Sequence, residues 1–167
     1  MTASRKEPGL SRSRSSVSTQ HPLDAKQRPL AHGALHNCFG CGQTNKAGLR
    51  LKFRADEHQR IHCRARIAKR FQGPPGYVHG GVIATLLDEA MSKANRQFGV
   101  LAMTRHMEVE YLKPVPVNVP IQITAHHRSA AGRGHHCEAE ITAEDGTTLA
   151  RGRALFIAIS PDYLKQT

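Results

Sequence analysis

Three residues, His79-Gly80-Gly81, stand directly before the one strong helical pattern of the chain, and Asp88 follows the histidine by nine positions. The free N–H groups and the dipole at a helix start stabilise a developing oxyanion. Because glycines lack a Cβ atom, an acyl group can approach this backbone closely, and we predict the Gly81 N–H as the main oxyanion donor. A carboxylate such as that of Asp88 can serve as a general base or as a nucleophile. The pattern therefore indicates acyl-transfer chemistry.

Two carboxylates compete for the role of base, because Glu89 directly follows Asp88. Asp88 lies about two turns inside the predicted helix, too far along to serve that helix's own start. One residue of helical rotation points Glu89 elsewhere, so we interpret Glu89 as structural or solvated. Without the preceding His-Gly-Gly turn, Asp88 itself would be interpreted as a solvated position of an amphipathic helix.

The remaining elements must position these residues. Apolar residues recur at helical spacing from Val82, and Gly99 ends a predicted helix of about 17 residues. Alternating apolar residues predict strands at 49–54, 61–67, 103–111, 119–125, 137–143 and 149–159. The first two are expected to pair as a hairpin, and Asp145-Gly146 predicts another tight turn. The order is two strands, one helix and four antiparallel strands, so the lone helix must be covered by the sheet.

Three stretches resemble the PaaI-like thioesterases of the hotdog superfamily, most closely the acyl-CoA thioesterases of the thioesterase superfamily member four type. The most specific stretch is 73–90, which carries the His-Gly-Gly turn and the acidic residue nine positions later. The second is 38–49, with Cys-Phe-x-Cys-Gly, and the third is 103–116, which ends in Lys-Pro-Val-Pro. The resemblance covers about residues 37 to 160.

This resemblance implies an α+β hotdog fold, in which a curved antiparallel β-sheet wraps around one central α-helix. It implies hydrolysis of fatty acyl-CoA, with medium to long chains favoured, to free acid and CoA. No cofactor is expected, since coenzyme A is part of the substrate. A homodimer or a dimer of dimers is expected, because in related dimers the carboxylate of one subunit faces the oxyanion donor of the other.

The resemblance also assigns roles around Asp88. Thr104 matches a Ser or Thr that orients water or the carboxylate, although it is also an ordinary strand residue. His79 shapes the turn and could bind near the thioester. The substrate-binding residues predicted with them are Gly80, Val82, Arg105 and Gln72, the last as a substitute for an Asn or Gln found before the turn in some relatives. Five basic residues either hold CoA phosphates or form a solvated face: Arg105, Lys113, Arg128, Arg151 and Arg153.

Composition divides the chain into a basic, Ser/Arg-rich tail at 1–33, expected to be disordered, a domain at 34–160 and a short C-terminal tail at 161–167. The chain carries 24 Lys and Arg against 13 Asp and Glu, a net charge of +11, which suits an anionic partner such as a CoA ester. A nucleic-acid partner is not expected, since no binding module is recognisable and aromatic residues make up only 5%.

Cys38 and Cys41 have the spacing of half a zinc site, with His32 and His36 upstream. A second such pair is missing, so we predict a glycine-bounded loop and no metal. Cys63 and Cys137 stand alone in predicted strands, so no disulfide framework is expected. No apolar run is long enough to span a bilayer. We expect a cytoplasmic protein without stable membrane insertion, or a mitochondrial one if the tail is a transit peptide.

Three alternatives to fatty acyl-CoA hydrolysis stay open. The first is hydrolysis of an aryl-CoA such as phenylacetyl-CoA, and the second is a non-catalytic acyl-CoA-binding hotdog protein. The third is a hotdog dehydratase or hydratase, which needs a His and a carboxylate cooperating on the acyl carbons. The spacing from His79 to Asp88 favours hydrolysis over this last chemistry.

Overall fold

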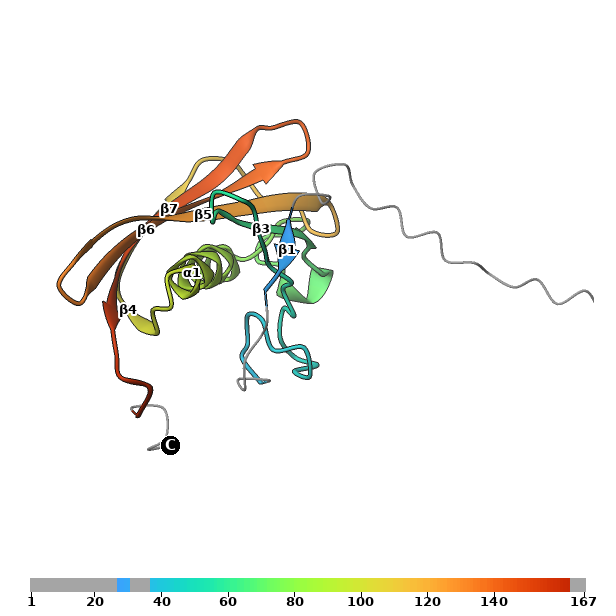
Figure 1. The fold of residues 1–167 in the computed structure, drawn as a ribbon. Coiled ribbons are helices and arrows are strands. Elements are labelled where there is room, and N and C mark those ends of the chain that lie inside the picture. The colour runs from blue at the N-terminus through green and yellow to red at the C-terminus, as the bar shows by residue number, and fades with distance from the viewer. Residues whose placement is uncertain (1–26, 31–36, 163–167) are drawn as a thin grey trace, which may run out of the picture.

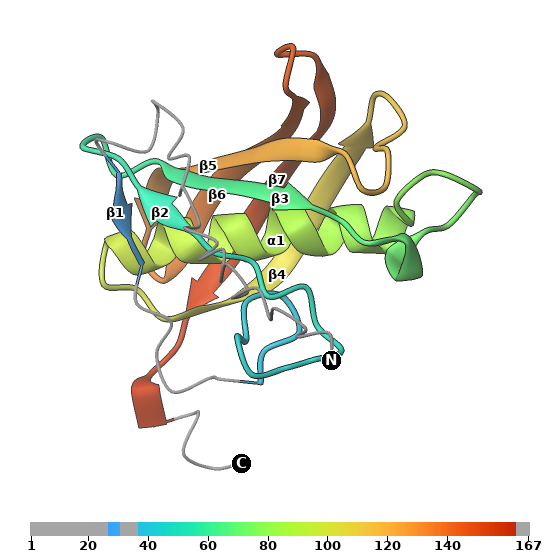
Figure 2. The ribbon, with the colours of Figure 1, turned by 90° about the vertical axis from the view of Figure 1, so that its right-hand side faces the viewer.

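Helix α1 (Gly80–Gln97) lies across one face of a curved antiparallel sheet in the computed structural model, which describes residues 27–30 and 37–162 (Figures 1 and 2). The sheet has seven strands in the order β1-β2-β3-β5-β6-β7-β4. The strands are β1 (Arg28–Pro29), β2 (Arg54–Ala55), β3 (Ile61–Arg66), β4 (Ala102–Tyr111), β5 (Pro120–Ala131), β6 (Gly134–Ala143) and β7 (Thr148–Ala158). A 3-10 turn, η2 (Lys69–Phe71), precedes α1. The predicted α+β architecture, a sheet wrapped around one helix, is confirmed.

The core fills the space between α1 and the sheet. The buried apolar residues of α1 are Ile83, Leu86, Leu87, Ala90, Met91 and Ala94. They pack with buried strand residues in a single cluster. Burying each Leu or Ile side chain contributes roughly 1.5–3 kcal/mol, which anchors α1 against the sheet. Gly152 of β7 permits the close approach, because a Cβ there would lie 3.3 Å from the Cβ of Leu87.

The turns agree with the sequence. Gly99 has φ 71° after the end of α1, and Gly146 has φ 84° in the turn between β6 and β7. Both values lie in the left-handed region that glycine adopts without strain. The four strands predicted after the helix are present and antiparallel.

The strand predicted at 49–54 is wrong in most of its length, because only Arg54–Ala55 joins the sheet. Arg50 has φ 52°, which interrupts an extended strand. The backbone N–H groups of Leu49 and Leu51 donate to Phe39 and Gly40 instead. The alternating pattern at 49–54 therefore predicted correctly which side chains are buried. It did not predict which backbone groups form sheet hydrogen bonds.

Part of the predicted N-terminal tail belongs to the sheet. Arg28–Pro29 lies within 1–33, yet pairs with Arg54–Ala55 as β1. Residues 1–26 and 31–36, which include His32 and His36, lie outside the described residues, as do residues 163–167.

Strand β4 forms one edge of the sheet and departs from its predicted alternation. Its register shifts between Thr104 and His106. Met103 and Tyr111, predicted on the buried face, are 52% and 55% exposed. A bulge on an edge strand re-aims the side chains on either side of it, which explains the exposure of Met103. Tyr111 lies beyond the shift and keeps the alternation of Met107 and Val109. In the described part of the chain, no helix is long and apolar enough to span a membrane.

Candidate active site

A turn that contains the Gly-Pro-Pro-Gly sequence of residues 73–76 precedes the start of α1. Val78 forms an isolated antiparallel β-bridge with Gln72, and the His79 N–H donates to the Phe71 carbonyl at 3.0 Å. His79 is the N-cap of α1, and its Nδ1 accepts a hydrogen bond from the Gly81 N–H at 3.0 Å. The predicted oxyanion donor is therefore engaged by His79 in the free protein.

Tyr111, at the end of β4, fixes the same helix start from the other side. Its hydroxyl donates to the Gly80 carbonyl at 3.1 Å, and its ring lies 3.7 Å from where a Gly80 Cβ would stand. Sequence reasoning assigned Tyr111 no role. The alternation of β4 puts Tyr111 on the same face as Met107 and Val109, which pack against the core, but it carries no signal for the partner of the hydroxyl.

Asp88 and Thr104 meet between the middle of α1 and the first residues of β4. The Thr104 hydroxyl donates to Asp88 Oδ1 at 2.6 Å. Burial raises the pKa of the Asp88 carboxyl above its ordinary value; the Thr104 hydrogen bond opposes that rise and the nearby Glu89 charge adds to it. The structure thus brings together the two residues that the sequence paired as base and orienting hydroxyl.

Asp88 and Gly80 belong to one helix but not to one reaction centre. Eight residues of helix separate them by about 12 Å along the axis. One acyl carbonyl cannot contact both the Asp88 carboxylate and the N–H groups at the start of the same α1. A complete site of the predicted kind needs the helix start of a second subunit.

Glu89 points away from Thr104, toward the loop that carries Cys38 and Cys41. It forms an ion pair with Lys93 at 3.0 Å, and both side chains are largely buried. Glu89 is thus a structural carboxylate in this fold, as its rotation from Asp88 predicted.

The predicted substrate-binding residues are dispersed. Gln72 lies in the turn before α1, where its Oε1 accepts from the Gly76 N–H at 3.5 Å. Val82 is half-buried in the first turn of α1, and its N–H donates to the His79 carbonyl. Arg105 is exposed at the bulge of β4, next to Thr104. Gly80 and Val82 share the helix start, whereas Arg105 lies on β4.

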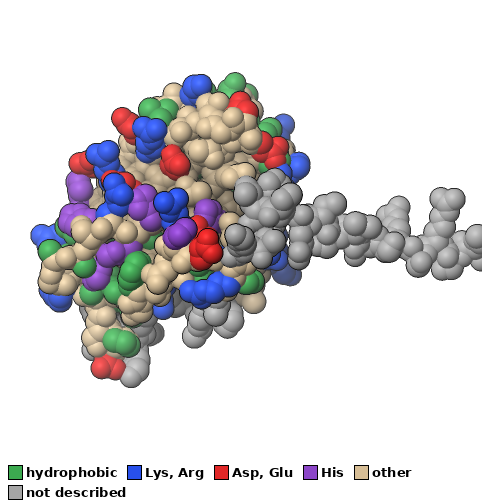
Figure 3. Space-filling view, turned by 45° about the horizontal axis from the view of Figure 1, so that its top comes forward, with side chains coloured by type: hydrophobic (Ala, Val, Ile, Leu, Met, Phe, Trp, Pro, Cys, Tyr) green, Lys and Arg blue, Asp and Glu red, His purple; other side chains and the backbone are tan. Residues whose placement is uncertain are grey.

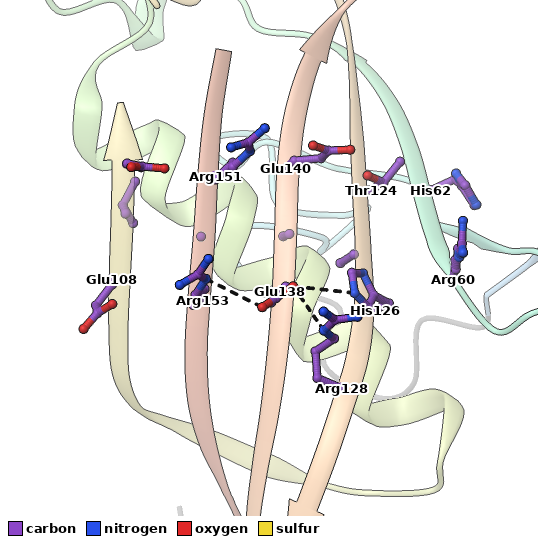
Figure 4. A pocket seen from close by; sticks show the side chains of 15 residues that line it. Arg60, His62, Glu108, Thr124, His126, Arg128, Glu138, Glu140, Arg151 and Arg153 are labelled. Carbon is purple, nitrogen blue, oxygen red and sulfur yellow. Dashed lines mark ion pairs between the residues drawn. The ribbon is translucent and has the colours of Figure 1, made fainter. Parts of the chain in front are cut away.

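A hollow of about 820 Å³ lies on the outer face of the sheet, away from α1 (Figure 4). Glu138 forms ion pairs there with Arg128 and Arg153 at 3.2 and 3.6 Å, and His126 Nε2 lies 3.7 Å from it. Acidic, basic and histidine side chains are interspersed over this face (Figure 3). Its lining includes neither Asp88 nor Thr104.

Three of the five basic residues considered for CoA phosphates therefore face away from the helix start. Arg128, Arg151 and Arg153 line the outer hollow. Cross-strand charge pairs stabilise such a solvated face modestly. We place the candidate acyl-transfer site at α1 and β4, because the outer hollow includes no helix start that could supply oxyanion donors.

Comparison with known proteins defines the class. The family model described as "Thioesterase superfamily" matches residues 75–150, which include the turn before α1, Asp88 and Thr104. The structure of "protein RHA08564, thioesterase superfamily protein" aligns with a TM-score of 0.70 and 28% identity, covering 73% of this chain and 60% of that one. Residues 75–150 thus match the thioesterase superfamily, and the chain shares the hotdog fold of its structural relatives.

A more particular likeness is to acyl-coenzyme A thioesterase THEM4 of Rattus norvegicus, 32% identical over 105 residues, which are 62% of this chain and 45% of the relative. This chain spans less than half the length of the THEM4 relatives it matches. The structure of smu.793 from Streptococcus mutans bound to acetyl CoA has a TM-score of 0.62 at 16% identity, covering 66% of this chain and 89% of that one. At that identity it shows the shared fold.

Proposed function

We propose that this protein is an acyl-CoA thioesterase that hydrolyses fatty acyl-CoA, preferably of medium to long chain, to free acid and CoA. The observation that carries the proposal is the hydrogen bond from Thr104 to the half-buried Asp88 carboxylate. The likeness to acyl-coenzyme A thioesterase THEM4, at 32% identity, supports the choice of a CoA thioester as substrate.

Asp88 attacks the thioester carbonyl carbon directly or accepts the proton of an attacking water. Thr104 donates to one carboxylate oxygen, which leaves the other oriented toward the substrate. The new C–O bond moves the carbonyl electrons onto oxygen, and that oxyanion accepts hydrogen bonds at the start of α1. Collapse of this intermediate breaks the C–S bond and releases the CoA thiolate, which takes up the proton that Asp88 accepted from water. Where Asp88 itself attacks, the acyl group stays on the carboxylate as an anhydride, and a water molecule then hydrolyses this anhydride to the free acid.

The oxyanion donor is the Gly81 N–H of a partner subunit. In the free protein this N–H donates to His79 Nδ1, so the substrate oxygen replaces the histidine nitrogen as acceptor. Gly81 is exposed, which leaves the N–H accessible to that exchange. His79 thus holds the helix start in shape until the substrate arrives.

A homodimer, or a dimer of such dimers, supplies the second helix start. β4 is an edge strand whose exposed side chains include Met103 and Tyr111, a surface suited to a second copy. Thr104 and Tyr111 lie on this strand and contact Asp88 and Gly80 respectively. An interface along β4 therefore adjoins both halves of the reaction centre.

Release of free thiol from a panel of acyl-CoA esters tests the activity. The panel runs from acetyl-CoA to long saturated chains and includes phenylacetyl-CoA. We expect the highest kcat/KM with medium or long chains. Preference for phenylacetyl-CoA would replace the fatty substrate with an aryl one, and tight binding of all esters without hydrolysis would contradict the enzymatic proposal.

A further inference from the structure

A second polar cluster lies where the loop that carries Cys38 and Cys41 meets α1. One ligand atom from each of Cys38, Cys41 and Glu89 lies within 4.8 Å of the other two. The Cys38 thiol donates to Glu89 Oε2 at 3.4 Å, and Lys93 Nζ lies 3.1 Å from Cys41 Sγ. The proposed thioesterase chemistry uses none of these four side chains.

The loop that carries the two cysteines is already shaped around Glu89. The Gly42 N–H donates to the Cys38 carbonyl at 2.9 Å, which closes a turn around the pair, and the Leu51 N–H donates to the Gly40 carbonyl at 2.9 Å. A Cβ at Gly40 would stand 2.9 Å from Glu89 Cδ, so only glycine lets the carboxylate reach this loop. The three groups are thus held together by backbone structure from two distant segments.

The donor set suits a soft, thiolate-binding cation. Tetrahedral zinc binds sulfur at about 2.3 Å and carboxylate oxygen at about 2.1 Å, which separates neighbouring ligand atoms by roughly 3.5–3.8 Å. The observed separations need only a small contraction to reach these values. Two thiolates and one carboxylate around zinc carry one net negative charge, which the Lys93 ammonium neutralises from its place beside Cys41 and Glu89. Calcium and magnesium prefer oxygen ligands and fit poorly.

We propose that Cys38, Cys41 and Glu89 form a zinc site that ties the loop at residues 37–48 to helix α1, with water in the fourth coordination position. This departs from the sequence prediction, which counted a CxxC pair but could not foresee that Glu89 lies beside it. The ion would tie the loop to α1 without taking part in the proposed hydrolysis, because its ligands form hydrogen bonds with neither Thr104 nor Asp88. The zinc-site proposal does not rest on the proposed thioesterase activity.

Zinc binding by the full chain tests the site. Protein stripped with a chelator and kept reduced is dialysed against micromolar Zn²⁺, and bound metal is measured by elemental analysis. We expect one zinc per chain, and a higher melting temperature with zinc than without it. The Cys38→Ala/Cys41→Ala double variant should bind zinc at least ~100-fold more weakly, and its melting temperature should no longer respond to the metal.

The matched control is Cys63→Ala, which removes a buried thiol in β3 outside the cluster and should bind zinc like the wild type. If the double variant does not fold, the single variant Cys38→Ala, at a half-buried position, and Glu89→Gln each supply the same comparison. A wild type that binds no zinc while reduced would overturn the site. So would zinc binding that survives in folded Cys38→Ala and Glu89→Gln.

Discussion

The Thr104 hydroxyl donates a hydrogen bond to Asp88 Oδ1 across 2.6 Å, from the first residues of β4 to the middle of α1. Thr104→Val removes this donor while keeping the side-chain shape. A hydrogen bond to a charged group contributes about 1.5–3 kcal/mol, so we expect kcat to fall at least ~10-fold. Thr104→Ser keeps the hydroxyl and should restore most of kcat. Equal loss in the Ser and Val variants would contradict a positioning role for the hydroxyl.

His79 holds the helix start, and its removal separates stability from catalysis. His79→Ala deletes the acceptor of the Gly81 N–H. Loss of an N-cap costs about 1 kcal/mol, which should appear in urea unfolding. Because the same change frees the proposed oxyanion donor, we expect kcat to stay within a few-fold of the wild type. A collapse of kcat in folded His79→Ala would instead assign the imidazole a direct part in the reaction.

The shared site predicts complementation between two inactive variants. Asp88→Asn removes the carboxylate, and Gly81→Val blocks the approach to the helix start, where an added Cβ would lie 3.2 Å from His79 Nδ1. In a mixed dimer one of the two sites carries both changes and the other carries neither. Equal mixing with full exchange of subunits should recover about a quarter of wild-type activity. If the mixture stays inactive although mixed dimers form, both groups act within one subunit.

Asp56 gives the fold a pH-dependent contribution at the turn between β2 and β3. Its Oδ1 accepts from the N–H groups of His58 and Arg60, and its Oδ2 lies 2.9 Å from His62 Nε2. Partial burial alone would raise the pKa of Asp56, but these hydrogen bonds, that of His62 foremost, hold the pKa below its ordinary value. The stabilisation is therefore present above the unfolded pKa of about 3.9 and is lost as pH falls through the lower folded value.

Unfolding of Asp56→Asn by urea measures this contribution. At about pH 7 we expect the variant to be less stable by about 1–2 kcal/mol. The difference should shrink as the pH falls below about 4, because the wild-type carboxylate then becomes protonated. A difference that is constant from neutral to acid pH would show that the charge of Asp56 contributes nothing.

The sequence predicted the elements whose signals are local. The helical spacing after Val82 and the turn glycines Gly99 and Gly146 each describe their own neighbourhood, and the structure confirms them. Residues 49–53 misled the strand prediction, because alternation records which side chains are buried and not which backbone groups pair. The left-handed conformation of Arg50 has no sequence signal, since arginine rarely adopts it.

Contacts between distant segments were predictable only where a family pattern marked them. Thr104 and Asp88 were paired by resemblance, whereas no pattern marked the hydrogen bond from Tyr111 to Gly80. Glu89 could be turned away from Asp88 by helical rotation, but its neighbours Cys38 and Cys41 lie about fifty positions earlier. Contacts between such distant residues form only when the whole chain is folded, so a local sequence pattern does not predict them.

The central claim is that the Asp88 carboxylate carries out acyl-CoA hydrolysis, and the most direct measurement compares Asp88→Asn with the wild type in a thiol-release assay. The control is Glu108→Gln, which neutralises an exposed carboxylate on β4. At matched folding and oligomeric state, we expect kcat to fall by about 10²–10⁴ in Asp88→Asn and to change little in Glu108→Gln. An Asp88→Asn variant that keeps full activity would contradict the assignment of this carboxylate to the reaction.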